Sequence, residues 1–287
     1  PDSPARFDPA LDWGLEPRLA LVIGDTRAGL RWQAGLAAGA RLGLGGGFAV
    51  AGSVAQAVAG NLDKGLPSDS VLPHVRSDYA RYAREGKTSI PALYAERIWT
   101  PAPDLFARVT AGLLEPMFMG LSTELLWRPA DRPWALGLDL NWVAQREYRQ
   151  RFAALGYSVG TGHLSLYADL PWWNLYAVLR GGRYLAGDWG GTIELGRRFD
   201  SGIEVGGFVT LTNVPFSQYG EGSFDKGIYV RVPLQLLGPE TASRATAVIR
   251  PVLRDGGQRL SVDNPLWEVT RDGRADALQR GYQGFLR

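Results

Sequence analysis

Residues 134–143, WALGLDLNWV, alternate strictly between large apolar side chains and small or polar ones. The apolar set consists of Trp134, Leu136, Leu138, Leu140 and Trp142. The interleaved set consists of Ala135, Gly137, Asp139, Asn141 and Val143. Because successive side chains of a β-strand point to opposite faces, this period of two predicts a strand between two different environments.

The same alternation recurs along the chain, for example in 11–23, 30–42, 117–128, 203–212 and 228–236. The alternating segments run about 10–13 residues, whereas strands of soluble proteins usually run about 5–6 and a tilted transmembrane strand needs about 9–11. Trp ends several apolar faces, as an aromatic girdle at a membrane interface would require. We therefore expect a membrane barrel rather than a soluble β-sandwich, which would have shorter strands and a charged solvent face.

The predicted fold is all-β, a transmembrane antiparallel up-and-down barrel of about 14 strands within a range of 12–16. The predicted strands cover residues 9–24, 28–43, 46–60, 89–100, 103–114, 117–128, 133–146, 161–171, 174–185, 188–199, 202–214, 226–237, 243–254 and 259–270. Residues 1–270 are assigned to the barrel and 271–287 to a periplasmic C-terminal tail. Short and long connections alternate, as periplasmic turns and external loops of bacterial barrels do.

The longest connection, residues 61–86, breaks the alternation. We predict an external loop here, with a short helix over 76–85. In a porin the same segment would be the loop that folds inward and constricts the lumen.

Composition excludes several other classes of protein. The chain has 287 residues, a formal net charge of +2 and no Cys. The missing Cys excludes a disulfide scaffold, a thiolate metal site and a Cys nucleophile. The near-neutral charge gives no support to nucleic-acid binding. No apolar run approaches the roughly 20 residues that a membrane-spanning helix needs.

The inward faces of the predicted barrel combine Gly and Ala with scattered polar side chains. The sheet must close, because unpaired N–H and C=O groups at an edge would each cost several kcal/mol in lipid. A hydrated lumen and a plug from another segment or another protein both fit this face. The candidate lumen-lining or polymer-contact residues are Arg108, Glu124, Asp139, Asn141, His163, Tyr167, Asp169, Glu194, Arg198, Tyr229 and Arg231.

The sequence offers little support for catalysis. It contains two His, and no HExxH or Gly-Lys-Ser/Thr phosphate motif is present. His163, Ser165 and Asp169 share the predicted inward face, but alternate positions of any strand do so by geometry. We predict no enzyme activity, no metal and no cofactor; an outer-membrane hydrolase using Ser165 and His163 is the alternative.

Several stretches resemble the YjbH/GfcD family of outer-membrane exopolysaccharide and capsule proteins. They are GLLEPMFMGLSTELLWRP (112–129), WALGLDLNWVAQRE (134–147), TGHLSLYADLPW (161–172), GRYLAGDWGGTIELGRRFDSG (182–202), YGEGSFDKGIYVRVPLQLL (219–237) and RDGGQRL (254–260), with VRSDYARY (75–82) a less specific match. The chain resembles the C-terminal barrel region of longer proteins that begin with a signal and lipidation sequence. Candidate residues in the motif loops are Arg183, Tyr184, Asp188, Trp189, Glu221, Asp225 and Lys226.

The resemblance implies a location in the Gram-negative outer membrane and a passive role in exopolysaccharide or capsule secretion or assembly. It implies contact with outer-membrane lipid, exopolysaccharide, and periplasmic and lipoprotein partners of the export system. It supplies no catalytic residues. The alternatives are a general diffusion porin and a plugged structural barrel that anchors periplasmic partners.

Overall fold

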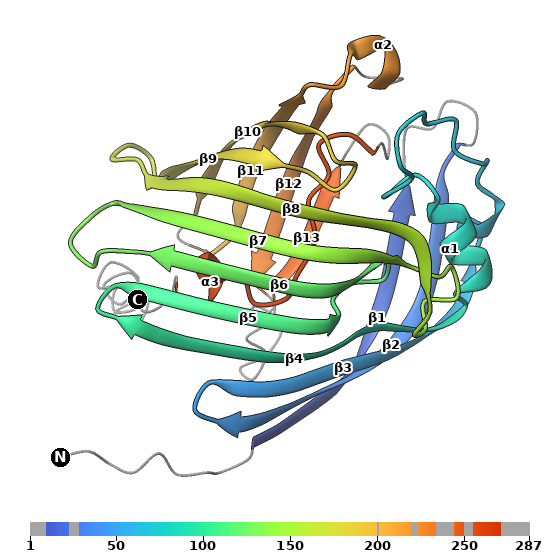
Figure 1. Cartoon of the computed structure of the whole chain (residues 1–287), viewed down its shortest axis with the longest axis horizontal. Helices are drawn as coiled ribbons and strands as arrows, with labels where there is room; N and C mark the ends of the chain where they lie inside the picture. The colour runs from blue at the N-terminus through green and yellow to red at the C-terminus, as the bar shows by residue number, and fades with distance from the viewer. Residues whose placement is uncertain are drawn as a thin grey trace.

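The computed structural model describes residues 10–22, 29–199, 201–219, 223–233, 244–249 and 255–270. Thirteen strands form one antiparallel sheet in sequence order (Figure 1). They are β1 Ala10–Val22, β2 Arg31–Gly45, β3 Phe48–Gly60, β4 Thr88–Ala102, β5 Leu105–Leu113, β6 Phe118–Trp127, β7 Trp134–Arg146, β8 Ala154–Asp169, β9 Leu175–Arg183, β10 Trp189–Arg198, β11 Glu204–Thr212, β12 Asp225–Pro233 and β13 Arg244–Ile249. The described residues also form four short helices: η1 Leu62–Lys64, α1 Tyr79–Glu85, α2 Phe216–Tyr219 and α3 Leu266–Val269.

The prediction of an all-β, antiparallel, up-and-down sheet is confirmed, and thirteen of the predicted strands correspond to β1–β13. The fourteenth, predicted over 259–270, is wrong, because residues 259–265 lie outside any strand and residues 266–269 form α3. Pro265 has no N–H to give to a ladder, and Asn264 adopts a left-handed backbone with φ 53°. β8 also begins earlier than predicted, at Ala154 rather than 161.

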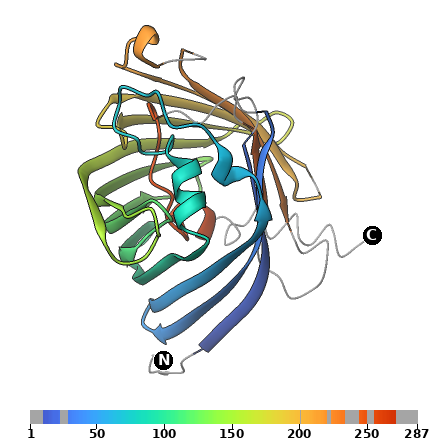
Figure 2. The same cartoon turned by 90° about the vertical axis from the view of Figure 1, so that its right-hand side faces the viewer.

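The sheet curls round on itself, which gives it an inner and an outer face (Figure 2). Among the described strands β1 pairs with β2, β13 pairs with β12, and no ladder joins β1 to β13. Closure into a barrel therefore stays a prediction. Within the same described ranges, no helix is long and apolar enough to cross a membrane.

The two faces of the sheet have opposite polarity, and the polarity is the reverse of that in a soluble protein. On the outer face Leu138 and Leu140 are 39% and 54% exposed. On the inner face Ser122 is fully buried and Glu124 is 8% exposed. The register aligns like with like across β6 and β7, since Leu125 pairs with Leu138 and Glu124 with Asp139. Among the described residues, the outer face of β6 and β7 is thus an exposed apolar surface.

Short turns join the strands at one end of the sheet, which we call the turn end. The glycine-rich stretch GLGGG (43–47) makes such a turn between β2 and β3. Gly47 has φ 80°, and a Cβ there would overlap the carbonyl oxygen of Ile98. Only glycine fits this position, because it lacks a Cβ and tolerates positive φ.

The opposite end, the loop end, carries the long connection between β3 and β4. Its helix α1 falls inside the predicted 76–85. Figure 2 shows α1 lying across the end of the curled sheet. Val75 is fully buried in a cluster with Phe118, Val143 and Leu185. The connection is therefore packed against the inner face, and it does not project freely as an external loop.

Candidate functional site

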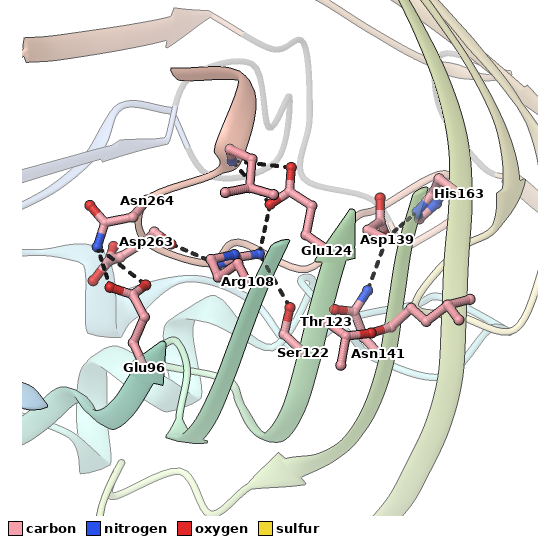
Figure 3. A network of polar contacts seen from close by, with 12 residues as sticks. Glu96, Arg108, Ser122, Thr123, Glu124, Asp139, Asn141, His163, Asp263 and Asn264 are labelled. Carbon is pink, nitrogen blue, oxygen red and sulfur yellow. Dashed lines mark hydrogen bonds and ion pairs between the residues drawn. The ribbon is translucent and has the colours of Figure 1, made fainter. Parts of the chain in front are cut away.

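The interior of the curled sheet is occupied by residues 255–270, which we call the inner segment. It includes the part of the chain predicted to be the last strand. Asp255 is 1% exposed, Gln258 2% and Leu266 0%, so the segment is enclosed. Figure 3 shows residues of β4–β8 converging on it.

Carboxylates of the sheet hold the backbone of the inner segment near α3. Glu124 accepts hydrogen bonds from the Leu266 N–H at 3.1 Å to each carboxylate oxygen (Figure 3). Arg108 forms an ion pair with Glu124 at 3.0 Å and donates to the carbonyl of Asp263 at 2.8 Å. These bonds give partners to the buried side chains of Glu124 and Arg108 and to the Leu266 N–H and Asp263 carbonyl. Such pairing offsets the cost of burying the charges.

Glu96 and Tyr94 of β4 bind the residues just before α3. Asn264 donates its amide to both oxygens of Glu96, at 3.1 and 3.3 Å (Figure 3). The hydroxyl of Tyr94 donates to the Asp263 carboxylate at 2.9 Å. Glu96 also pairs with Arg41 of β2 at 2.7 Å, so this contact links three parts of the chain.

An apolar core surrounds α3 toward the turn end. The indole of Trp267 stacks on the ring of Tyr167 with centroids 4.4 Å apart. Leu266 and Trp267 pack in one buried cluster with Leu126, Ala135, Val178 and aromatic residues of β8, β9 and β12. The guanidinium of Arg128 lies 4.1 Å from the centre of the Trp267 ring. The interior at this level is packed like a protein core.

The middle of the inner segment meets β7 and β8 through Asp139. The Asp139 carboxylate lies 3.0 Å from Nδ1 of His163 and 3.4 Å from a guanidinium nitrogen of Arg259. It also accepts a hydrogen bond from Asn141 at 3.0 Å (Figure 3). Asp139, Asn141 and His163 therefore form a buried polar group that positions Arg259.

The geometry does not assemble the hydrolase alternative. His163 pairs with Asp139, while Asp169 pairs with Arg198 at 2.7 Å. Among the described residues, no hydrogen bond joins Ser165 to His163. The described residues also contain no group of three or more His, Cys, Asp or Glu that could hold a metal ion.

The remaining predicted inner-face residues form a second network on β9–β12. Arg180 pairs with Glu194 at 3.1 Å, and the Tyr229 hydroxyl donates to Glu194 at 2.6 Å. Arg198 and Arg231 both approach Glu204, at 3.4 and 3.2 Å. Arg231 also lies 3.7 Å from Glu268 of the inner segment. The predicted lumen residues thus pair with one another and with the inner segment, and their contact with a polymer stays a prediction.

The motif-loop residues have structural contacts of their own. Asp188 accepts a hydrogen bond from the Gly257 N–H at 2.8 Å, and the buried Tyr184 hydroxyl bonds Thr192 at 2.7 Å. The side chain of Arg183 donates to the carbonyl of Gly187 at 3.3 Å. The backbone N–H of Trp189, a residue that is 60% exposed, donates to the side-chain oxygen of Asn213 at 2.9 Å.

The last three motif residues lie at or before the start of β12. Asp225 and Lys226, placed among the motif-loop residues, are its first two residues, in agreement with the strand predicted from 226. Lys226 lies 4.0 Å from the ring of Phe224. The prediction for Glu221 falls outside the described residues.

A third set of contacts, at the loop end, is one that the sequence analysis missed. Asp255 accepts hydrogen bonds from the backbone N–H groups of Arg76 and Ser77 at 2.8 and 3.0 Å, and from the Ser77 hydroxyl at 2.6 Å. The Arg76 guanidinium binds both oxygens of Glu115, at 2.7 and 3.0 Å. These residues belong to three of the family-like stretches. That membership was the available signal, although it does not specify which residues meet.

Arg146 is the buried clamp of the loop end. Its side chain is fully buried and donates to the carbonyl oxygens of Ile90, Pro91, Glu115, Gln150 and Arg151 at 2.7–3.2 Å. The Tyr82 hydroxyl of α1 donates to the Arg146 carbonyl at 2.6 Å. The side chain therefore ties β4 and the β5–β6 and β7–β8 connections together, and the backbone carbonyl of the same residue adds α1.

The fold and interior define the class of protein: an up-and-down β-sheet with an exposed apolar outer face and a polar inner face filled by its own chain. The chain belongs to the YjbH family, whose model, described as exopolysaccharide biosynthesis protein YbjH, matches residues 2–272. It is 40% identical over 271 residues to an uncharacterized lipoprotein YjbH of Escherichia coli (strain K12). That match covers 91% of this chain and 38% of the relative, so the chain spans about two fifths of the relative's length. No solved structure matches the chain.

Proposed function

We propose that this chain forms an outer-membrane β-barrel that assists exopolysaccharide secretion or assembly without bond chemistry. The observation that carries the proposal is the inverted polarity of the sheet. Leu121, Leu140, Leu164 and Ile193 on the outer face are 44–62% exposed, while charged partners are buried inside. Lipid is the solvent in which such an apolar face is stable. The family description and the relative's description as a lipoprotein support a place in the cell envelope.

The filled interior favours a plugged barrel over a general diffusion porin. A porin needs a water-filled lumen, whereas Leu266 and Trp267 sit in an apolar core inside this sheet. Two carboxylates of the inner face, Glu96 and Glu124, accept hydrogen bonds from the inner segment. We infer that the barrel acts as a scaffold and docking surface, with its partners bound at the ends, and that polymer does not pass through it.

The test is deletion and restoration of the gene in its host, with surface polymer as the readout. We expect deletion to reduce cell-surface exopolysaccharide and the full-length protein to restore it. The restored protein should fractionate with the outer membrane and migrate faster on a gel before heating than after, as folded barrels do. Unchanged polymer after deletion, or recovery in the soluble fraction, would reject the proposal.

A further inference from the structure

Six basic side chains gather at the loop end, and we call them the basic cap: Lys64, Arg81, Arg84, Lys87, Arg149 and Arg151. All six residues are exposed. Their neighbourhood is set by contacts within the cap. Arg84 donates to the carbonyl of Asp63 at 2.8 Å, and Lys87 lies 3.8 Å from the Asp63 carboxylate. The guanidinium of Arg81 lies 3.7 Å from the ring centre of Tyr148, next to Arg149.

The positive charge of the cap is only partly matched by acids. Four acids share these segments with the six bases. Glu85 pairs with Arg81 at 2.8 Å, and Asp63 lies 3.8 Å from Lys87. Asp78 accepts a hydrogen bond from the Tyr148 hydroxyl at 3.2 Å, and Glu147 accepts one from the Ala153 N–H at 3.4 Å. Among the described residues, the side chains of Lys64, Arg149 and Arg151 have no ion-pair or hydrogen-bond partner. The whole chain has a net charge of only +2, so this local excess is a concentration of charge rather than a general property. Unmatched like charges raise the local potential and attract anions.

The cap is held rigid from beneath. Arg146 binds the backbone carbonyls of Gln150 and Arg151, and the Gln150 side chain donates to the carbonyl of Tyr82 in α1 at 3.2 Å. The Ile90 N–H donates to the carbonyl of Gln150 at 3.1 Å. The 147–153 connection and α1 are therefore fixed relative to each other. A preorganised charged surface loses little conformational entropy when a ligand binds.

Aromatic rings accompany the charges. The ring of Tyr148 is stacked under Arg81 and packs against Tyr82, which leaves Phe152, 64% exposed beside Arg151, as a ring open to a ligand. Guanidinium groups bind carboxylates through paired hydrogen bonds, and aromatic rings stack on the apolar faces of pyranoses. Carboxylate-bearing sugars combine the two features that this surface would recognise.

We propose that the basic cap docks an acidic polysaccharide, a polymer of carboxylate-bearing sugars, at the cell surface. The inference rests on the proposed function, because an outer-membrane barrel with periplasmic short turns presents its loop end outward. Figure 2 shows α1 across the end of the curled sheet, above the interior. That position suits a polymer arriving from outside better than the phosphates of the surrounding lipid, which would lie beside the outer face.

The test measures binding of the full-length protein in detergent micelles to polyuronate, with dextran as the neutral polymer. The variant Lys64→Gln/Arg149→Gln/Arg151→Gln removes the three unmatched charges. Its matched control, Arg97→Gln/Arg132→Gln/Arg197→Gln, removes three exposed charges of the turn-end half. We expect polyuronate binding that weakens with salt, a roughly tenfold loss in the cap variant, and little change in the control.

Three results would overturn the docking proposal: no polyuronate binding by the wild-type protein, equal binding of dextran, or equal losses in both variants. Binding to vesicles containing lipopolysaccharide but not to polyuronate would assign the cap to lipid and also overturn it. A protein that restores polymer secretion in its host yet fails these binding tests would refute the docking alone, so the two proposals fail separately.

Discussion

Arg146 illustrates why one residue can matter more than its sequence context suggests. In the sequence it is one of 31 basic residues at the end of a predicted strand. In the structure its buried guanidinium serves five backbone carbonyls from two connections and from β4. Buried carbonyls without partners are costly, so the clamp and its acceptors depend on each other.

We expect Arg146→Ala to destabilise the protein by about 3 kcal/mol or more, because it leaves several buried carbonyls unpaired. Arg146→Lys should retain part of the stability, since an ammonium offers three donors. Arg149→Ala is the matched control, and its exposed site predicts a change within about 0.5 kcal/mol. Unfolding in detergent micelles measures all three. Equal stability of Arg146→Ala and Arg149→Ala would contradict the clamp.

The contacts of His74 indicate that the stability of the β3–β4 connection at the loop end depends on pH. Burial opposes protonation, but the Ser70 carbonyl and the Asp78 carboxylate, each 3.1 Å from a ring nitrogen, raise the pKa of His74. Both partners are acceptors here, so only the doubly protonated ring satisfies both. A raised folded-state pKa gives stability that is complete below the unfolded pKa and is lost as pH rises through the folded value.

We therefore expect protease cleavage in residues 66–78 to increase as pH rises from about 6 to 8, around the ordinary pKa of His. In His74→Gln this change with pH should disappear. Asp78→Asn should shift it to lower pH, because the nearby negative charge is removed. A cleavage rate in the wild-type protein that stays flat across this range would exclude the His74 contacts as its determinant.

The residues that sequence reasoning placed correctly are those governed by alternation. Asp139, Glu124 and Arg231 were assigned inward because a strand has period two, and they point inward. Arg76, Glu115 and Asp255 were not singled out, because they lie outside the strands. Their meeting depends on how distant connections fold together, which no local pattern encodes.

At the scale of elements, the outer apolar face is the feature with the clearest energetic consequence. We expect Leu138→Arg to cost roughly 2–4 kcal/mol and to impair assembly, as a charge on a lipid-facing strand does near the midplane. Leu138→Ala removes apolar area without adding charge and should assemble. Asp131→Arg, in the exposed turn before β7, adds the same side chain in water and should also assemble.

The measurement is the yield of heat-modifiable protein in the outer-membrane fraction. Wild-type yield from Leu138→Arg would show that the outer face does not meet lipid. Loss in Asp131→Arg as well would mean that the chain tolerates no added Arg, and would leave the lipid-facing assignment of Leu138 without support.

The inner segment shows where an element-level prediction failed. Its Leu260, Val262 and Leu266 mimic a period of two, which predicted a strand over 259–270. The polar residues between them turn out to bond the inner face, as in the Asp263 and Asn264 contacts with β4. The Asn264–Pro265 pair was the local signal against a strand, because Asn favours turns and Pro has no N–H for a ladder.

At the scale of the molecule, strand parity bears on closure. In an up-and-down sheet β1 and β13 run in the same direction, because both have odd positions in the order. Direct closure would therefore pair them in parallel, whereas antiparallel closure needs one more strand. Alternation along single strands predicted the faces well, but it could not count strands or detect the filled interior, since both depend on contacts across the whole sheet.

We propose that the protein is a membrane barrel whose interior is filled by its own chain. Single-channel conductance of the full-length protein in a planar bilayer tests this proposal, with insertion verified by protease protection. We predict that the inserted wild-type protein is silent. Glu124→Ala/Asp255→Ala, which releases both ends of the inner segment, should conduct intermittently. A steady, large conductance from the wild-type protein would show that the interior is open and not filled by the inner segment.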